Sequence, residues 1–124
     1  TEHHTLIIPK RHVADYFDLY QPERNAIEAM LHDQRQSILD HDPAVTGFNI
    51  GINAGASAGQ TVFHVHVHLI PRRDGDVENP RGGVRGVIPN KQGTEMFVVG
   101  QKYSRAKDIH DKYGDYPEFC ALTW

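Results

Sequence analysis

The chain has little cysteine, no long apolar run and no excess of basic charge. Its single cysteine, Cys120, excludes a disulfide within the chain and is compatible with a reducing compartment. No apolar run approaches the roughly 18 residues that a membrane span needs. Lysine and arginine number 13 against 16 aspartates and glutamates, a formal charge of −3, which does not favour a dedicated nucleic-acid binder. We therefore expect a cytoplasmic protein that binds neither membrane nor nucleic acid.

The length and composition are those of one small globular domain. A chain of 124 residues is long enough for one domain and short for two. Its hydrophobic fraction of 39% and charged fraction of 23% argue against collagen, coiled coil and wholesale disorder. The unusual number is nine histidines, which are not gathered in a tag-like tract and so require an explanation.

The apolar pattern predicts short strands and one long helix. A helical stripe begins at Pro22 and ends at Asp42, and a shorter helix is expected over residues 13–20. Residues 46–53 and 61–70 alternate between apolar and polar, which predicts two antiparallel strands with one face on the helix. The other expected elements are a strand at 5–8, a loop at 72–90, a strand at 95–99 and a helix at 103–113.

The most informative feature is a row of histidines, His64, His66 and His68, which alternates with valines. On a strand, side chains two residues apart share a face and stand roughly 6.5–7 Å apart. Such a row can perform catalysis, bind a metal, or lie at the surface without a role. One metal cannot take all three rings, because the outer pair would be roughly 13 Å apart while a Zn–N bond is about 2.0–2.1 Å. Two adjacent rings would need a further ligand, for which the candidates are His3, His4 and His12.

Catalysis by this row has a definite physical form. A neutral imidazole is a good nucleophile near pH 7, and adjacent imidazoles disfavour each other's protonation. The central His66 has two such neighbours, so we expect it to stay neutral and attack, while a flanking histidine carries a proton. A phosphorus centre suits this arrangement, because attack by nitrogen gives a phosphoramidate that water can hydrolyse.

The residues before the row are compatible with a phosphate site. Gly55 and Gly59 allow the backbone to come close, and free N–H groups in such a loop can hold an anion. Gln60 and Thr61 supply further donors, and Asn53 ends the preceding strand on its polar face. An ordinary hairpin loop, and an asparagine that binds its own backbone, are the alternatives.

Together these blocks resemble the histidine triad (HIT) family. Residues 64–70 are similar to the family's His-φ-His-φ-His-φ-φ motif, in which φ is apolar. Residues 4–12 resemble a second block of the family, and residues 53–62 resemble its phosphate-binding approach. Residues 71–73 and 82–85 resemble a bacterial-type branch.

The resemblance implies an α+β fold. This fold has an antiparallel sheet of the HIT type, a long helix packed on one face, and the active-site histidines on a strand. The implied activity is hydrolysis or transfer of a nucleotide at an α-phosphate, without a cofactor or a bound metal. Dinucleoside polyphosphates, nucleoside phosphoramidates and adenylylated groups are the implied substrates. The resemblance also implies a homodimer that takes a small-molecule nucleotide.

The same resemblance implies a role for each site residue. His66 is the nucleophile that forms a nucleotidyl-histidine intermediate, and His64 orients it through its backbone carbonyl. His68 contacts a phosphate oxygen or the leaving group, and His4 matches a fourth histidine that supports the site. The implied phosphate or nucleotide contacts are Asn53, Gly59, Gln60 and Thr61.

The chain departs from the family pattern at both ends. It begins after the strand and helix whose residues normally hold the base and ribose, and residues 96–99 are expected to fill the vacant strand position. His3 stands where the family often has glycine or another small residue. We therefore predict a HIT-like catalytic domain over residues 1–92, lacking the usual first strand and helix, and a C-terminal extension of unknown role over residues 93–124.

Two other functions stay open. A nucleotide-binding module without turnover would result if the missing wall weakened the alignment of the substrate. A metal-binding protein would use the histidines as ligands, and stoichiometric zinc in the purified protein would favour it.

Overall fold

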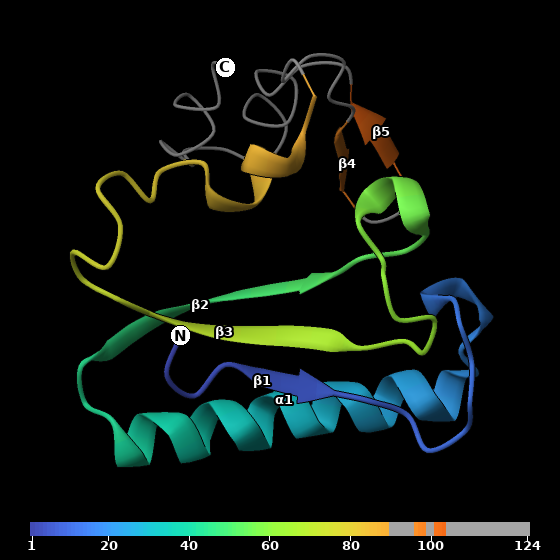
Figure 1. The fold of residues 1–124 in the computed structure, drawn as a ribbon, viewed down its shortest axis with the longest axis horizontal. Helices are drawn as coiled ribbons and strands as arrows, with labels where there is room; N and C mark the ends of the chain where they lie inside the picture. Colours follow the sequence, from blue (N-terminus) through green and yellow to red (C-terminus); the bar gives the residue numbers. More distant parts are fainter. Residues whose placement is uncertain (90–95, 99–100, 104–124) are drawn as a thin grey trace. The chain divides into compact units, whose positions relative to one another are not determined.

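The computed structural model describes residues 1–89, 96–98 and 101–103 and divides the chain into two compact units, Thr1–Val84 and Arg85–Trp124. The first unit is described throughout. Its main elements are the strands β1 (Thr5–Ile7), β2 (Val45–Ile52) and β3 (Val67–Arg73) and the helix α1 (Gln21–His41). Two short 3-10 turns, η1 (Tyr16–Asp18) and η2 (Ala56–Ala58), lie in the connections. Figure 1 shows α1 running along one face of the sheet.

Helix α1 has clear signals at both ends. It begins one residue before the predicted start, with Pro22 in its first turn, and the Glu23 carboxylate accepts the Tyr20 N–H at 2.8 Å. It ends where predicted: the Asp42 N–H donates to the Ile38 carbonyl at 2.9 Å, and Pro43 follows. No helix among the described residues combines the length and the apolar character needed to cross a membrane.

The sheet has the strand order β1-β3-β2, and both pairings are antiparallel, as the alternation predicts. The central strand therefore contributes most to the core. Ile7 is 2% exposed, Val67 2% and Leu69 1%, and these three side chains pack with Ile27 and Ile38 of the helix. Burial of each such side chain contributes roughly 1.5–3 kcal/mol. The α+β fold with an antiparallel sheet and a long helix on one face is confirmed.

The third strand begins later than the alternation indicates. It starts at Val67, so His68 lies on β3 while His64 and His66 precede it. The alternation in burial nevertheless continues, because the Val65 N–H donates to a carbonyl outside the sheet, that of Val13, at 2.9 Å. The backbone is thus held in register without being part of the ladder. Farther upstream the alternation fails, since the Phe63 ring is 51% exposed.

The short helix expected over residues 13–20 is a single 3-10 turn. The Asp15 carboxylate accepts the Phe17 N–H at 2.8 Å and starts the turn. Leu19 then returns to extended backbone and is 3% exposed in the core, which ends it. Burial of this leucine therefore overrides a weak helical preference.

The expectation for residues 96–99 is wrong. Strand β4 (Met96–Val98) pairs with β5 (Gln101–Tyr103) in a two-stranded antiparallel sheet of its own, not with the sheet of the first unit. A partner only a few residues away costs little loop-closure entropy, which favours local pairing. Tyr103 ends a strand, and the rest of the helix predicted over 103–113 lies outside the described residues. The domain division at residue 92 stays a prediction.

Candidate active site

The histidine row is joined by two further rings from the N-terminal segment. The ring centroids of His66 and His68 are 5.2 Å apart. His4, just before β1, stacks on His68 with a centroid distance of 5.1 Å. His12 contacts His64 with a centroid distance of 4.9 Å. The fold therefore brings His4 to the row as the sequence predicts, and it adds His12.

The backbone fixes the tautomers of His64 and His66. Nδ1 of His66 lies 2.9 Å from the His64 carbonyl oxygen, and Nε2 of His64 lies 2.9 Å from the Pro9 carbonyl oxygen. A carbonyl oxygen only accepts, so both of these ring nitrogens donate. In a neutral His66 ring, Nε2 therefore carries the free lone pair. This is the nitrogen that can attack an electrophile.

The ring at the other end of the row is part of a histidine pair. Nε2 of His4 and Nδ1 of His68 are 2.9 Å apart, so one of the two nitrogens donates and the other accepts. Burial lowers the pKa of His68, and the neighbouring His4 and His66 lower it further by charge repulsion. The pair therefore favours a neutral His68 near pH 7.

The loop before the row is shaped by two glycines. Gly55 has a φ of 95° and Gly59 a φ of 92°, in a region that L side chains rarely adopt. Between them the short turn η2 closes through its own backbone, because Ala58 and Gly59 donate to carbonyls within the loop at 3.1 and 3.0 Å. These N–H groups are thus used internally and are not directed at an anion.

Gln60 supports this loop from inside. Its side chain is 5% exposed, and its Oε1 accepts the Gly55 N–H at 2.8 Å. Its Nε2 donates to the carbonyls of Ala14 at 2.8 Å and Val62 at 3.1 Å. The sequence assigns Gln60 to phosphate, but these polar atoms are occupied by backbone partners. The other three candidates, Asn53, Gly59 and Thr61, are exposed.

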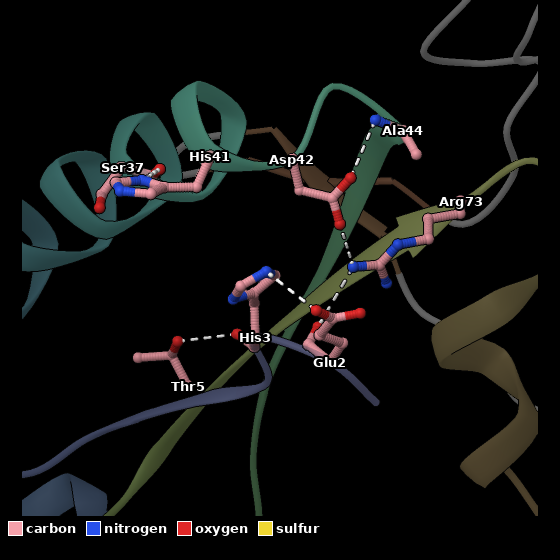
Figure 2. Close-up of polar contacts among 8 residues, drawn as sticks. All are labelled: Glu2, His3, Thr5, Ser37, His41, Asp42, Ala44 and Arg73. Atoms are coloured by element: carbon pink, nitrogen blue, oxygen red, sulfur yellow. Dashed lines mark hydrogen bonds and ion pairs between the residues drawn. The ribbon is translucent and has the colours of Figure 1, made fainter.

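A second polar cluster lies where β3 ends, and the sequence gives no signal for it. Figure 2 shows Arg73 between Asp42, at the end of α1, and the N-terminal residue Glu2. His3 lies 3.7 Å from the Glu2 carboxylate and has a φ of 67°, the left-handed region that favours glycine. Glycine would adopt this conformation without the strain that a side chain brings.

No convergent metal site is present in the described part of the chain, where no group of three or more His, Cys, Asp or Glu side chains is placed to hold an ion. The histidine rings contact one another instead, and the His68 ring meets that of His66. His4 contacts His68, and His12 contacts His64.

Comparisons with known proteins support the resemblance to the histidine triad family. The HIT domain family matches residues 1–75. An uncharacterized HIT-like protein from Mycobacterium tuberculosis is 40% identical over 112 residues, covering 87% of this chain and 77% of that protein. An asymmetrical bis(5'-nucleosyl)-tetraphosphatase from Schizosaccharomyces pombe is 40% identical over 73 residues, covering 59% and 40% respectively.

A solved structure shares the fold. A zinc-bound histidine triad family protein from Mycobacterium smegmatis superposes with a TM-score of 0.57 at 39% identity. The match covers 61% of this chain and 55% of that one, so it spans about half the length of that protein.

Proposed function

This chain belongs to the histidine triad (HIT) family, and we propose that it is a nucleotide hydrolase or nucleotidyl transferase acting at an α-phosphate through a nucleotidyl-His66 intermediate. One observation carries the proposal. Nδ1 of His66 donates to the His64 carbonyl at 2.9 Å, which leaves the lone pair of a neutral ring on Nε2. A nucleophile with a fixed tautomer on a supported backbone needs little reorganisation before attack.

The reaction has two steps. Nε2 of His66 attacks the α-phosphorus, a P–N bond forms, and the bond from phosphorus to the leaving group breaks. The leaving group departs with the electron pair and takes a proton from solvent. Water, or an acceptor alcohol in a transferase, then attacks phosphorus and loses its proton to solvent. The P–N bond breaks with its electron pair returning to Nε2, and the nucleotide is released with the histidine restored.

The neighbouring residues support both steps. The His68 ring is 5.2 Å from that of His66 and contacts a phosphate oxygen or the leaving group, with His4 behind it. His64 positions the nucleophile through its carbonyl oxygen. Asn53 and Thr61 contact the phosphate, while Gly59 provides the turn and Gln60 keeps the loop in shape.

Dinucleoside polyphosphates are the first substrates to test, because a relative from Schizosaccharomyces pombe is named for the hydrolysis of such a compound. Nucleoside phosphoramidates and adenylylated groups follow from the family resemblance. We also propose a homodimer, which light scattering on the purified protein would test, and a cytoplasmic location.

The decisive experiment is the intact mass of the protein after brief mixing with diadenosine polyphosphate or adenosine phosphoramidate. Wild type, His66→Ala and the control His32→Ala, an exposed residue on α1, are compared with analysis of the products. We expect one nucleotidyl group on wild type and on the control, and none on His66→Ala, which still binds nucleotide. Turnover that survives in His66→Ala would refute the covalent mechanism.

Two outcomes would favour other functions. Nucleotide binding by wild type without adduct or product would favour a binding module. The zinc-bound relative from Mycobacterium smegmatis makes elemental analysis the matching test for metal binding. Stoichiometric zinc in the purified protein would favour that function.

A further inference from the structure

Arg73 joins the end of β3 to two segments that are distant from it in sequence. Its Nη2 donates to Oδ2 of Asp42 at 2.6 Å and to the backbone carbonyl of Glu2 at 3.4 Å (Figure 2). The side chains of Arg73 and Asp42 are 22% and 18% exposed, so this ion pair is largely covered. The guanidinium hydrogen bond is also the largest cause of the lowered pKa of Asp42.

Asp42 is a firm anchor for Arg73. Its N–H caps α1 through the Ile38 carbonyl at 2.9 Å, and its Oδ1 accepts the Ala44 N–H at 3.0 Å. The carboxylate therefore has one defined position at the end of the helix. Arg73 in turn transmits that position to the N-terminal turn through the Glu2 carbonyl.

The N-terminal turn is under strain. The His4 N–H donates to the Thr1 carbonyl at 3.2 Å, and the Thr5 hydroxyl donates to the His3 carbonyl at 2.9 Å. Between them His3 has a φ of 67°, which is unfavourable for a residue with a side chain. A turn of this kind persists only where its surroundings hold it. Arg73 is a residue outside the turn that hydrogen-bonds to its backbone, at the Glu2 carbonyl.

The position of His4 depends on this turn. The ladder between β1 and β3 begins with Thr5 opposite Leu69, so His4 lies just outside it. Its ring nevertheless meets His68 with 2.9 Å between Nε2 and Nδ1. The turn that includes His4 therefore contributes to the position of its ring, together with the adjoining ladder.

We propose that Arg73 is a positioning residue for the His4–His68 pair. It holds the N-terminal turn against the end of α1 and thereby sets the ring of His4 at hydrogen-bonding distance from His68. Arg73 and Asp42 together are neutral, so they act on the pair through its position and not through a net charge. The inference rests on the proposed catalytic use of the histidine row.

The test combines titration with kinetics in Arg73→Gln and Asp42→Asn. Asp33→Asn is the matched control, because Asp33 is an exposed residue of α1 that has no described contact with Arg73 or with the N-terminal turn. The imidazole NMR signals are titrated in each free protein, and kcat and KM are measured on a dinucleoside polyphosphate. Assignment of His68 is checked with His68→Asn.

We expect Arg73→Gln to raise the pKa of His68, because a displaced His4 repels its proton less and leaves it more hydrated. We expect kcat to fall by no more than about fivefold, the loss of one hydrogen bond between His4 and His68, with KM changed less than about twofold, since alignment and not binding is lost. Asp42→Asn should shift both in the same direction by less, and Asp33→Asn should match wild type. Arg73→Lys, which keeps the charge opposite Asp42, should restore part of both.

Other outcomes overturn the inference. Arg73→Gln could lower the melting temperature while the pKa of His68 and kcat stay at wild-type values, which would make the role of Arg73 merely structural. If Arg73→Gln does not fold, unchanged values in both Asp42→Asn and Arg73→Lys overturn the inference. If wild type has no turnover, the proposed function fails, but the titration of His68 still decides the role of Arg73.

Discussion

His4 and His68 are 64 positions apart in the chain, yet a single hydrogen bond of 2.9 Å joins Nε2 of His4 to Nδ1 of His68. One ring must donate and the other accept, so this contact holds one proton between two bases. Protonation of both rings would replace the hydrogen bond by the repulsion of two charges. The pair is therefore intact only while at least one of its rings is neutral.

We predict that His4→Phe weakens catalysis without removing it. A phenyl ring preserves the stacking on His68 but cannot hydrogen-bond, so the loss is that of one hydrogen bond, about 1 kcal/mol or roughly fivefold in kcat. The pKa of His68 should rise, since repulsion by His4 disappears while burial remains. Steady-state kinetics and imidazole titration check both, with His32→Phe on α1 as the control. An unchanged kcat in His4→Phe would show that the His4 hydrogen bond does not contribute to catalysis.

The pH dependence of catalysis follows from the lowered pKa of His68. The ordinary value is 6.5, and burial together with His4 and His66 lowers it in the folded protein. His68 thus stays neutral above 6.5 and becomes charged only as the pH falls through its lower folded value. We predict that the step in the pH profile of kcat/KM that reports His68 lies below pH 6.5, and that His4→Phe moves this step to higher pH. A profile that does not move in His4→Phe would contradict the coupling of the two rings.

His3→Gly should stabilise the protein. The φ of 67° costs an L residue roughly 1–2 kcal/mol, and glycine removes this cost. Part of the resulting gain in stability is lost, because glycine has more conformational freedom in the unfolded chain. The net increase in the free energy of unfolding should be about 0.5–1 kcal/mol, measured by urea denaturation. His32→Gly in the middle of α1 is the matched control and should lose about 1 kcal/mol. A loss of stability in His3→Gly would mean that the 3.7 Å contact with Glu2 outweighs the strain.

Acid should destabilise the fold through its carboxylates. Arg73 lowers the pKa of Asp42 and Arg72 lowers that of Asp76, both below the ordinary 3.8. The unfolded chain then binds protons at a higher pH than the folded chain does, so this stabilisation is present above about pH 3.8 and is lost as the pH falls through the folded values.

Thermal unfolding between pH 7 and pH 2.5 measures this effect. The midpoint of wild type should fall steeply at the acid end, and that of Asp76→Asn should start lower and fall less. Asp33→Asn, in α1, is the control and should keep the wild-type slope. Equal slopes in all three proteins would show that the Arg72–Asp76 pair does not contribute to acid sensitivity.

The sequence predicted the parts of the fold that depend on local periodicity. Alternation over residues 46–53 and 61–70 gave the antiparallel pair, and the stripe from Pro22 gave the long helix. The start of β3 was missed because the Val65 N–H finds the Val13 carbonyl instead of a strand partner. A residue pattern carries no information about such a distant acceptor.

The sequence predicted the row of three histidines at the candidate site but not the contacts that support it. The alternation of His64, His66 and His68 with buried valines placed the rings on one side of the backbone. The bond from Arg73 to Asp42 joins residues 31 positions apart, and the resemblance of residues 71–73 to a bacterial-type branch does not point to Asp42 as the partner. Such contacts are set by where a helix and a strand end, which depends on the packing of the whole unit.

Gln60 illustrates the same limit and gives the last prediction. Gln60→Leu keeps most of the side-chain volume but removes the partners of the Gly55 N–H and of the Ala14 and Val62 carbonyls. Each unsatisfied buried group costs roughly 1–3 kcal/mol, and water reaching the exposed loop offsets part of the sum. We expect the free energy of unfolding to fall by about 2–4 kcal/mol in urea denaturation.

The control for this substitution is Gln36→Leu, on the exposed face of α1, where Gln36 bonds only to Asp40 among the described contacts. It should change stability by less than about 0.5 kcal/mol. Nucleotide affinity is measured on both variants at a temperature where each is folded. If Gln60→Leu kept wild-type stability and lost affinity, Gln60 would be a phosphate ligand, as its sequence context suggests. Lost stability with affinity retained in the folded fraction would establish it as the internal support of the loop, because only the hydrogen bonds to the backbone would then be missing.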